Sequence, residues 1–177
     1  LRTRHDAVLI ATGVYKAREI KVPGVGLNGV YPALDYLIAS NRKGLGDEVP
    51  AFDDGSLDAA GKDVVVIGGG DTAMDCVRTA VRQGANSVKC LYRRDRQNMP
   101  GSLREVKNAE EEGVTFTWLS APEAFLGDDK VTGVRTVATG LDRDGAPGPS
   151  FEEPAELKAK VVVLAEGTRG PLGQAYR

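Results

Sequence analysis

The sequence predicts an α/β fold with a parallel β-sheet. A continuous apolar run at 63–67 leads into glycines at 68–70 and then into an amphipathic segment at 71–83. Apolar runs and helical periodicity alternate up to residue 118, which is typical of β-α-β-α-β units whose sheet is covered on both faces. Short segments between glycine-containing turns follow, and these indicate an antiparallel meander. We therefore expect a three-layer, Rossmann-like (FAD/NAD(P)-binding) domain with a parallel sheet and an antiparallel β-meander.

The composition is that of a globular protein with one sizeable core. The chain has 177 residues, of which 41% are hydrophobic and 27% are charged, and a formal net charge of −2. Such a charge gives no general attraction to nucleic acid or to an anionic membrane. No apolar run approaches the roughly 20 residues of a membrane span, and the first one is far too short for a secretory signal. We therefore expect a cytoplasmic protein with no nucleic-acid partner and no membrane partner.

Cysteine and histidine are scarce. The chain holds two cysteines, Cys76 and Cys90, and one histidine, His5. The cysteine spacing matches neither a metal knuckle nor a CxxC redox pair, so we expect buried free thiols. A single histidine argues against a metal site or a histidine-based triad.

The first sixty residues are expected to contain a strand, a loop, a helix and a linker. Residues 7–11 form an apolar run closed by Thr12-Gly13, and 23–26 form a loop with proline and glycine. Pro32 suits the first position of an amphipathic helix. The expected apolar face of that helix consists of Leu34, Leu37 and Ile38. The polar segment 43–61 is expected to be an exposed linker with some mobility.

Strands and helices alternate in the central unit. The apolar run 63–67 predicts a buried strand, and 87–92 predicts the next one. Between them, an amphipathic helix at 71–83 ends at Gly84. Its expected sheet-facing residues are Ala73, Cys76, Val77, Ala80 and Val81.

A further helix is expected at 103–112, before a strand at 114–118. Ser102 and Glu105 have the spacing of a capping box, in which each side chain binds a free amide of the first turn. Gly113 ends this helix.

The remainder of the chain has shorter segments. Those at 122–126, 131–139 and 151–154 predict the antiparallel meander. The last apolar run, at 160–165, is expected to return to the parallel sheet.

The glycines after the first central strand form a G-x-G-x-x-A turn. In such a turn Gly68 allows the sharp change of direction, Gly70 admits a phosphate, and Ala73 lets the helix pack close to the sheet. Gly69, between them, belongs to the same turn, and Asp71 and Thr72 begin the helix. Because a carboxylate next to a pyrophosphate would be repulsive, we expect Asp71 to cap or to bind a ribose. A purely structural turn would use the same glycines, but the flanking strand and helix favour a dinucleotide site.

Arginines follow the second central strand. Arg93 and Arg94, with Arg96 nearby, stand where the 2′-phosphate of NADP would lie, whereas NAD and FAD favour an acidic residue there. Because of this position, NADP(H) is the preferred ligand. The alternative explanation is that the arginines form a solvated charged face. The loop 99–102 is expected either to close over the adenosine side or simply to lead into the next helix.

No residue has the features of a general base, a nucleophile or a metal ligand. This is consistent with hydride chemistry, in which the cofactors carry the reaction and the protein supplies position and electrostatics. It is equally consistent with a domain that catalyses nothing.

Several motifs in order resemble one flavoprotein family. The motifs are those at 6–13, 23–24, 68–76, 92–95, 99–101 and 108–114. Together they resemble the small (beta) subunit of NADPH-dependent glutamate synthase and its relatives over about residues 5–140. Members of that family are NADPH-dependent oxidoreductases in which an NADPH domain is inserted into an FAD domain. The hydride passes to the flavin, and electrons continue through iron–sulfur clusters to the large subunit of glutamate synthase.

The resemblance implies a division of the chain and a set of cofactor contacts. It assigns 1–30 to a flanking FAD domain, 31–160 to the NADPH domain, and 161–177 to a strand that returns towards the FAD domain. The implied cofactor contacts are Gly68, Gly69, Gly70, Asp71, Thr72, Arg93 and Arg94. The FAD glycine motif and the cysteine-rich iron–sulfur segment of the family have no counterpart here, so the chain alone is expected to hold NADPH without completing the electron path.

Two features depart from the family pattern. Related reductases carry a further arginine four positions after the pair, where this chain has Asn98, so we expect either a contribution from Arg96 or a weaker phosphate site. The segment 165–170 differs from the expected apolar–glycine ending and is closer to electron-transfer-flavoprotein quinone oxidoreductases. The origin of residues after about 141 therefore stays open between a divergent, a truncated and a joined tail.

Two alternative functions stay open at this point. One is a non-catalytic scaffold or docking domain that keeps the fold without the cofactor. The other is an FAD- or NAD-binding unit of another flavoprotein, which a ligand without a 2′-phosphate would reveal.

Overall fold

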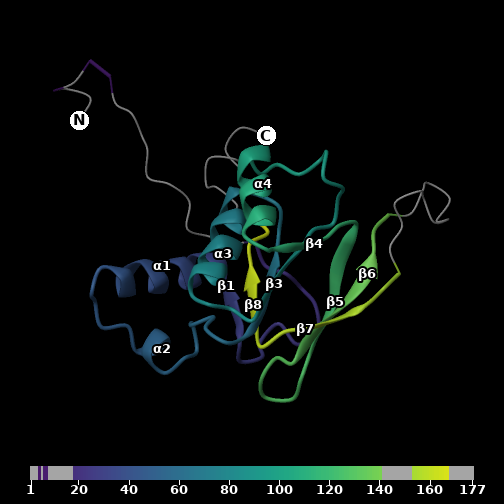
Figure 1. The fold of residues 1–177 in the computed structure, drawn as a ribbon, viewed down its shortest axis with the longest axis horizontal. Helices are drawn as coiled ribbons and strands as arrows, with labels where there is room; N and C mark the ends of the chain where they lie inside the picture. Colours follow the sequence, from purple (N-terminus) through teal and green to yellow (C-terminus); the bar gives the residue numbers. More distant parts are fainter. Residues whose placement is uncertain (1–3, 5, 8–17, 141–152, 168–177) are drawn as a thin grey trace.

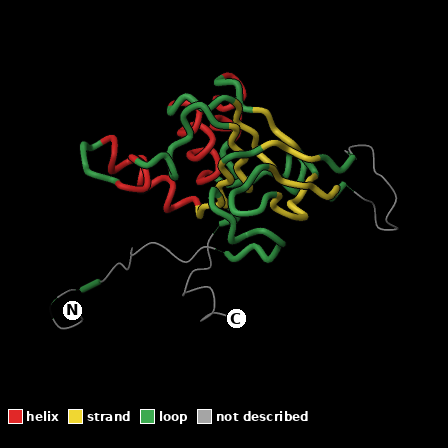
Figure 2. Tube along the Cα trace, turned by 90° about the horizontal axis from the view of Figure 1, so that it is seen from below, coloured by secondary structure: helices red, strands yellow, loops and turns green. Residues whose placement is uncertain are grey.

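The computed structural model describes residues 4, 6–7, 18–140 and 153–167 of the chain. Helices lie on one face of a parallel sheet and an antiparallel sheet lies on the other, which confirms the predicted three-layer α/β class (Figure 1 and Figure 2). In chain order the elements are β1 (Val30–Pro32), α1 (Ala33–Gly44), α2 (Pro50–Asp53), β2 (Asp63–Ile67), α3 (Asp71–Arg82), β3 (Ser87–Leu91), α4 (Leu103–Glu111), β4 (Thr115–Thr117), β5 (Ser120–Leu126), β6 (Gly133–Ala138), β7 (Glu156–Lys158) and β8 (Val161–Leu164).

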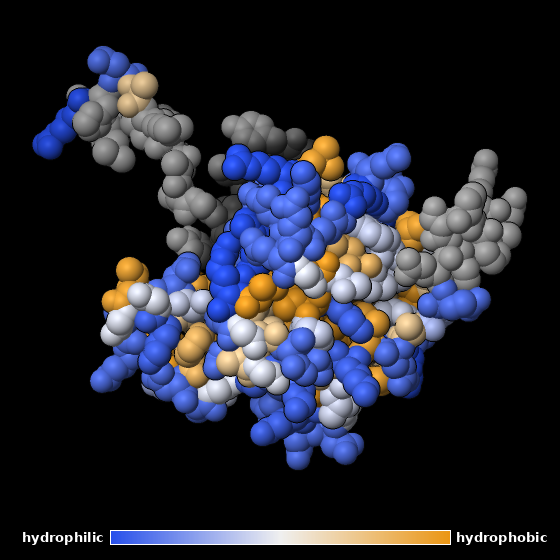
Figure 3. All heavy atoms as spheres, in the orientation of Figure 1, coloured by the Kyte–Doolittle hydropathy of each residue, from blue (hydrophilic) through white to orange (hydrophobic). Residues whose placement is uncertain are grey.

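The parallel sheet has the strand order β1-β8-β2-β3-β4. Apolar clusters cover both faces of its centre, whereas hydrophilic residues cover much of the described surface seen in Figure 3. Val64 and Val66 of β2 pack on the helical side, whereas Val65 and Ile67 pack against the antiparallel sheet. β8 lies between β1 and β2, with Val162 opposite Val65, so the predicted return of the last strand to this sheet is confirmed. The predicted NADPH domain ends at residue 160, directly before β8. β8 itself belongs to the parallel sheet of that domain.

Helix α3 follows the predicted pattern. It begins at Asp71 and ends at Arg82, next to the expected limits, and Gly84 beyond it has a φ of +81°. Its buried residues are Ala73, Met74, Cys76, Val77 and Ala80. Their small and medium side chains let the helix pack directly on β2 and β3.

Helix α1 buries a face that differs from the expected one. The prediction named Leu34, Leu37 and Ile38, but Leu37 is only partly buried and Ile38 is 47% exposed. The buried residues are instead Ala33, Tyr36 and Ala39. The hydroxyl of Tyr36 donates to Oε1 of Gln83 on α3's C-terminal side at 2.8 Å, which fixes this rotation of the helix. Pro32 ends β1 and precedes the first helical residue.

The segment expected to be a polar linker contains structure. α1 continues to Gly44, and the short helix α2 lies within 43–61. Val49 and Leu57 are buried together with Ala39 of α1. A small apolar cluster therefore holds this segment against α1, which the charged composition concealed.

Helix α4 starts where predicted, but the capping box does not form. The side chain of Ser102, the N-cap residue, makes no hydrogen bond to the first turn of α4. The backbone N–H of Ser102 instead donates to the Asp71 carboxylate at 3.0 Å, and Glu105 turns to Arg78, with 2.5 Å between charged atoms. Asp71 thus has a capping role, as expected, but towards α4 and not towards its own helix.

The antiparallel meander has the order β5-β6-β7. β5 includes the segment predicted at 122–126, and β6 lies within the segment predicted at 131–139. The third strand is shifted from 151–154 to β7, and 151–152 lie outside the described residues. Residues 8–11 of the expected first strand, and His5, also lie outside them.

Both cysteines are buried and free, as predicted. Burial raises the pKa of the Cys90 thiol to about 12 and that of the Cys76 thiol further still, so both stay protonated at neutral pH. Within the described ranges, no helix combines the length and apolarity needed to cross a bilayer.

Arg78 joins α3 to α4 through two carboxylates. Its guanidinium lies 2.5 Å from Glu105 and 2.6 Å from Glu112, and all three side chains are at most one-third exposed. The hydrogen bonds from Arg78 hold the pKa of Glu112 below its usual value of 4.5. A carboxylate with a lowered folded-state pKa stabilises the fold above its unfolded pKa, and this contribution is lost as the pH falls through the folded value.

We expect Glu112→Gln to lower the free energy of unfolding by about 1 kcal/mol at neutral pH, because Arg78 loses a charged acceptor. The difference from the parent chain should shrink as the pH falls from 4.5, where Glu112 of the unfolded chain begins to bind a proton, through the lower pKa that Glu112 has in the folded chain. Urea denaturation at a series of pH values measures both effects.

Glu111→Gln is the matched control. Glu111 is 63% exposed and lies 3.6 Å from Lys107, so its removal should change stability little at any pH. An effect of Glu112→Gln that stays constant down to acidic pH would contradict the role given to this ion pair.

Candidate functional site

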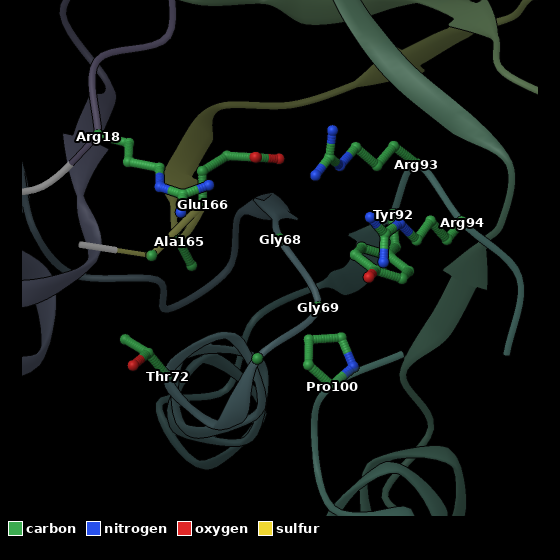
Figure 4. Close-up of a pocket in the computed structure, with 12 residues that line it drawn as sticks. Arg18, Gly68, Gly69, Thr72, Tyr92, Arg93, Arg94, Pro100, Ala165 and Glu166 are labelled. Carbon is green, nitrogen blue, oxygen red and sulfur yellow. The ribbon is translucent and has the colours of Figure 1, made fainter. Parts of the chain in front are cut away.

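A cavity of about 310 Å³ opens at the carboxyl end of the parallel sheet. Three neighbouring strands, β8, β2 and β3, lead into it, and one residue comes from the segment before β1. Its lining residues are Arg18, Gly68, Gly69, Gly70, Thr72, Tyr92, Arg93, Arg94, Pro100, Ala165, Glu166 and Gly167. Figure 4 shows the glycine turn in the middle of this site. The site thus lies where open α/β sheets bind their ligands.

The three glycines of the turn differ in what a side chain at each position would meet. Gly68 has a φ of +141°, and a Cβ there would overlap the carbonyl of Ala165. A Cβ at Gly69 would overlap the ring of Tyr92. At Gly70 a Cβ would meet nothing within 4 Å, because this residue borders open space at the cavity. Gly68 and Gly69 therefore allow Ala165 and Tyr92 to pack against the turn, whereas Gly70 leaves open space at the cavity.

The N-terminus of α3 faces the cavity. No described side chain caps this helix, so amides of its first turn can bind an anion. Thr72 lines the cavity, whereas Asp71 points to α4 through its bond to Ser102 and is not among the lining residues. Ala73 is fully buried behind the turn. The one carboxylate of this first turn is thereby directed elsewhere.

Arg93 and Arg94 reach the cavity from the end of β3. Figure 4 shows both side chains extending from this end towards the glycine turn. Their backbone is anchored, since the carbonyl of Arg93 accepts from the Thr139 hydroxyl at 2.6 Å and that of Arg94 accepts from the Leu119 N–H at 3.2 Å. The pair therefore stands on a fixed segment with its charged groups accessible.

Arg96 does not reach the cavity. It forms two bonds with the carboxylate of Glu110 on α4, at 2.5 and 2.8 Å. Asn98, which stands where relatives were expected to carry an arginine, binds the carboxylate of Asp95. These bonds lower the pKa of Asp95 and fold the loop into a compact turn. The structure thus separates Arg96 from the other two arginines.

The loop at 99–102 packs against the glycine turn. The N–H of Gly101 donates to the carbonyl of Gly69 at 2.8 Å, and Pro100 lines the cavity. The loop therefore borders the site and also leads into α4, and its expected closure over the adenosine side of a ligand stays a prediction.

Sequence reasoning missed Arg18 and Glu166. Arg18 is brought in by a backbone bond, in which its N–H donates to the carbonyl of Gly167 at 3.0 Å. Glu166 follows β8, whose place beside β2 depends on pairing between distant segments. The departure of the segment 165–170 from the family pattern could have directed attention to Glu166. No pattern in the sequence around Arg18 predicts its place at the cavity.

The arrangement suits an elongated anionic ligand. Three arginines, the amides of a helix N-terminus and a glycine turn line one cavity, and Glu166 supplies the one carboxylate of the lining where the chain is described. Tyr92 directs its hydroxyl to the carbonyl of Asn98 at 3.2 Å. Among the residues with described positions, no group of His, Cys, Asp and Glu could hold a metal ion.

Comparison with protein families gives one match over nearly the whole chain. The family model described as "Pyridine nucleotide-disulphide oxidoreductase" matches residues 2–172. The similarity therefore continues past residue 141, into the part of the chain whose origin the sequence patterns left open.

Three relatives show the similarity in sequence, and each is much longer than this chain. The "Glutamate synthase [NADPH] small chain" of Azospirillum brasilense is 62% identical over 94% of this chain and 36% of its own length. The protein of the same name from Escherichia coli is 47% identical over 96% and 37%. The "NADPH-Fe(3+) oxidoreductase subunit beta" of Geobacter sulfurreducens is 38% identical over 92% and 23%. The chain thus spans about a third or less of these relatives.

Solved structures show the same fold at low sequence identity. Mycobacterium tuberculosis FprA in complex with NADPH has a TM-score of 0.68 at 20% identity, over 90% of this chain and 49% of FprA. Thioredoxin reductase from T. acidophilum has a TM-score of 0.64 at 16% identity, over 90% and 43%. The chain therefore shares its layered fold with these two structures.

We expect Gly69→Ala to lower the free energy of unfolding by about 1–3 kcal/mol, because the new methyl group overlaps the Tyr92 ring. Gly70→Ala is the matched control. Its φ of −90° and ψ of 177° suit alanine, and the added Cβ meets open space. Urea denaturation of both variants measures the contrast, and an equal loss of stability in the two would contradict this account of the turn.

Proposed function

Because the chain belongs to the pyridine nucleotide-disulphide oxidoreductase family, we propose that its cavity binds NADPH. In this proposal the chain is the electron-input domain of a flavin oxidoreductase of the glutamate synthase small-subunit type. One observation carries the proposal most: Arg93 and Arg94 extend towards a glycine turn that also opens onto a helix N-terminus. This combination suits a ligand with a pyrophosphate and a separate 2′-phosphate.

Each part of the turn has a proposed task. Gly68 and Gly69 bring the backbone close to the pyrophosphate, and Gly70 leaves space for it. The first amides of α3, with Thr72, bind its oxygens, while Ala73 keeps the helix near the sheet. Asp71 acts indirectly, by holding the start of α4 beside the turn.

The arginines distinguish the two nicotinamide cofactors. Arg93 and Arg94 bind the 2′-phosphate, which NADPH has and NADH lacks. Arg96 joins them only if it leaves Glu110, so it is the weakest of the proposed contacts. Asp95 and Asn98 support the loop that carries these side chains.

NADPH supplies a hydride when it is bound, and we propose that FAD in the rest of a longer protein receives it. The curated relatives extend well beyond the matched stretch, which leaves room for an FAD domain. Iron–sulfur clusters would also belong there, since this chain has only two cysteines and both are buried. The proposed partner of the whole protein is the large subunit of glutamate synthase.

The route to the flanking FAD domain is proposed to start at the cavity. Arg18 and Gly167 are joined by a backbone hydrogen bond of 3.0 Å and stand before β1 and after β8. The segments 1–30 and 161–177 would then carry the connection on either side of the NADPH domain.

Calorimetric titration with NADPH and NADH side by side tests the proposed ligand. We expect tight binding of NADPH and weak binding of NADH, with no flavin absorbance in the purified chain. A folded chain that binds neither nucleotide would refute the cofactor proposal and favour a scaffold. Equal binding of both would refute the role of the arginines.

We expect the double change of Arg93 and Arg94 to Ala to weaken NADPH binding by about 3 kcal/mol, or roughly a hundredfold in Kd. NADH binding should change little, because it lacks the group that these arginines bind. The control changes Arg42 and Arg82 to Ala, which removes the same charge at exposed positions outside the cavity. A similar loss of NADPH binding in that control would show that overall charge, and not these two side chains, is responsible.

A further inference from the structure

The order of the strands divides the cavity into two ends. β2 carries the glycine turn and lies between β3 and β8. Arg93 and Arg94 follow β3, whereas Ala165, Glu166 and Gly167 follow β8. A dinucleotide with its pyrophosphate on the turn therefore has one nucleoside at the end of β3 and the other at the end of β8.

Among the described residues that line the cavity, Glu166 alone carries a carboxylate. Figure 4 shows its side chain pointing into the cavity from the β8 side, while Arg93 points in from the β3 side. Glu166 is partly buried and directly follows Ala165, whose carbonyl is packed against Gly68. The backbone at this position is therefore fixed close to the turn.

A carboxylate only accepts hydrogen bonds, so it cannot serve the phosphates. The half of NADPH that lies away from the 2′-phosphate has the opposite chemistry. Its ribose carries two hydroxyl donors, its carboxamide carries N–H donors, and it has no phosphate beyond the shared pyrophosphate. The position of Glu166 and the chemistry of this half therefore match.

We propose that Glu166 accepts hydrogen bonds from the nicotinamide riboside half of NADPH and holds that half at the end of β8. This inference rests on the proposed function of the cavity. Arg93 and Arg94 fix the 2′-phosphate, and Glu166 fixes the other end of the same ligand. The segment 165–167, which departs from the apolar ending expected of the family, thereby gains a binding role.

Two ligands test the proposal. NADPH contains both halves, whereas 2′,5′-ADP contains the adenosine half with its phosphates and lacks the nicotinamide riboside. We expect Glu166→Ala to weaken NADPH binding roughly tenfold in calorimetry and to leave 2′,5′-ADP binding within about twofold. Glu166→Gln should weaken NADPH binding less, because the amide keeps one acceptor oxygen in the same shape.

Three results would overturn the inference. Unchanged NADPH binding in both variants would show that Glu166 does not contact the ligand. Tighter binding of both ligands would show that Glu166 repels the phosphates. Equal weakening of both ligands would show that the substitution disturbs the turn.

A control and the parent chain separate the remaining explanations. Glu19→Ala removes the same charge beside Arg18 from an exposed residue that does not line the cavity, and it should leave both affinities unchanged. If the parent chain binds neither ligand, the proposed function itself fails. If it binds both and only the Glu166 effect is missing, this inference alone fails.

Discussion

The site depends on the close approach of two backbone segments that are distant in the sequence. The carbonyl of Ala165 occupies the space that a side chain at position 68 would need, so the ends of β2 and β8 can meet only at a glycine. The N–H of Ala165 donates to the carbonyl of Ile67 at 2.7 Å and fixes this contact. β8 itself pairs with β1 on one side and with β2 on the other. The same contact places the residues after β8 beside the turn.

The packing of α4 decides which charges reach the cavity. Asp71 caps the start of α4, and Glu110 binds Arg96. The acids Glu105 and Glu112 are both bound to Arg78. These four carboxylates therefore bind partners around α4 and do not line the cavity. Arg93 and Arg94 do line it, and they make the cavity positive near the end of β3.

Local sequence patterns predict the centre of the fold and the glycine turn. They fail where contacts between distant segments determine the structure. β2 and α3 were predictable because a continuous apolar run and a helical period are properties of the segment itself. β1 was missed because it has three residues and ends in Pro32. The buried face of α1 depends on the bond between Tyr36 and Gln83, and the engagement of Arg96 depends on a helix that comes later in the chain.

The two segments that lead away from the parallel sheet are also part of the candidate site. Arg18 precedes β1 and Gly167 follows β8, yet a backbone hydrogen bond joins them at the edge of the cavity. A ligand that extends from the arginines of β3 across the turn must end beside this pair, because β8 is the next strand of the sheet. In the proposed longer protein, ligand binding and the connection to the FAD domain would therefore share the same residues. The glycine turn defines the centre of the candidate site, and the other end of the site lies where the segments before β1 and after β8 meet.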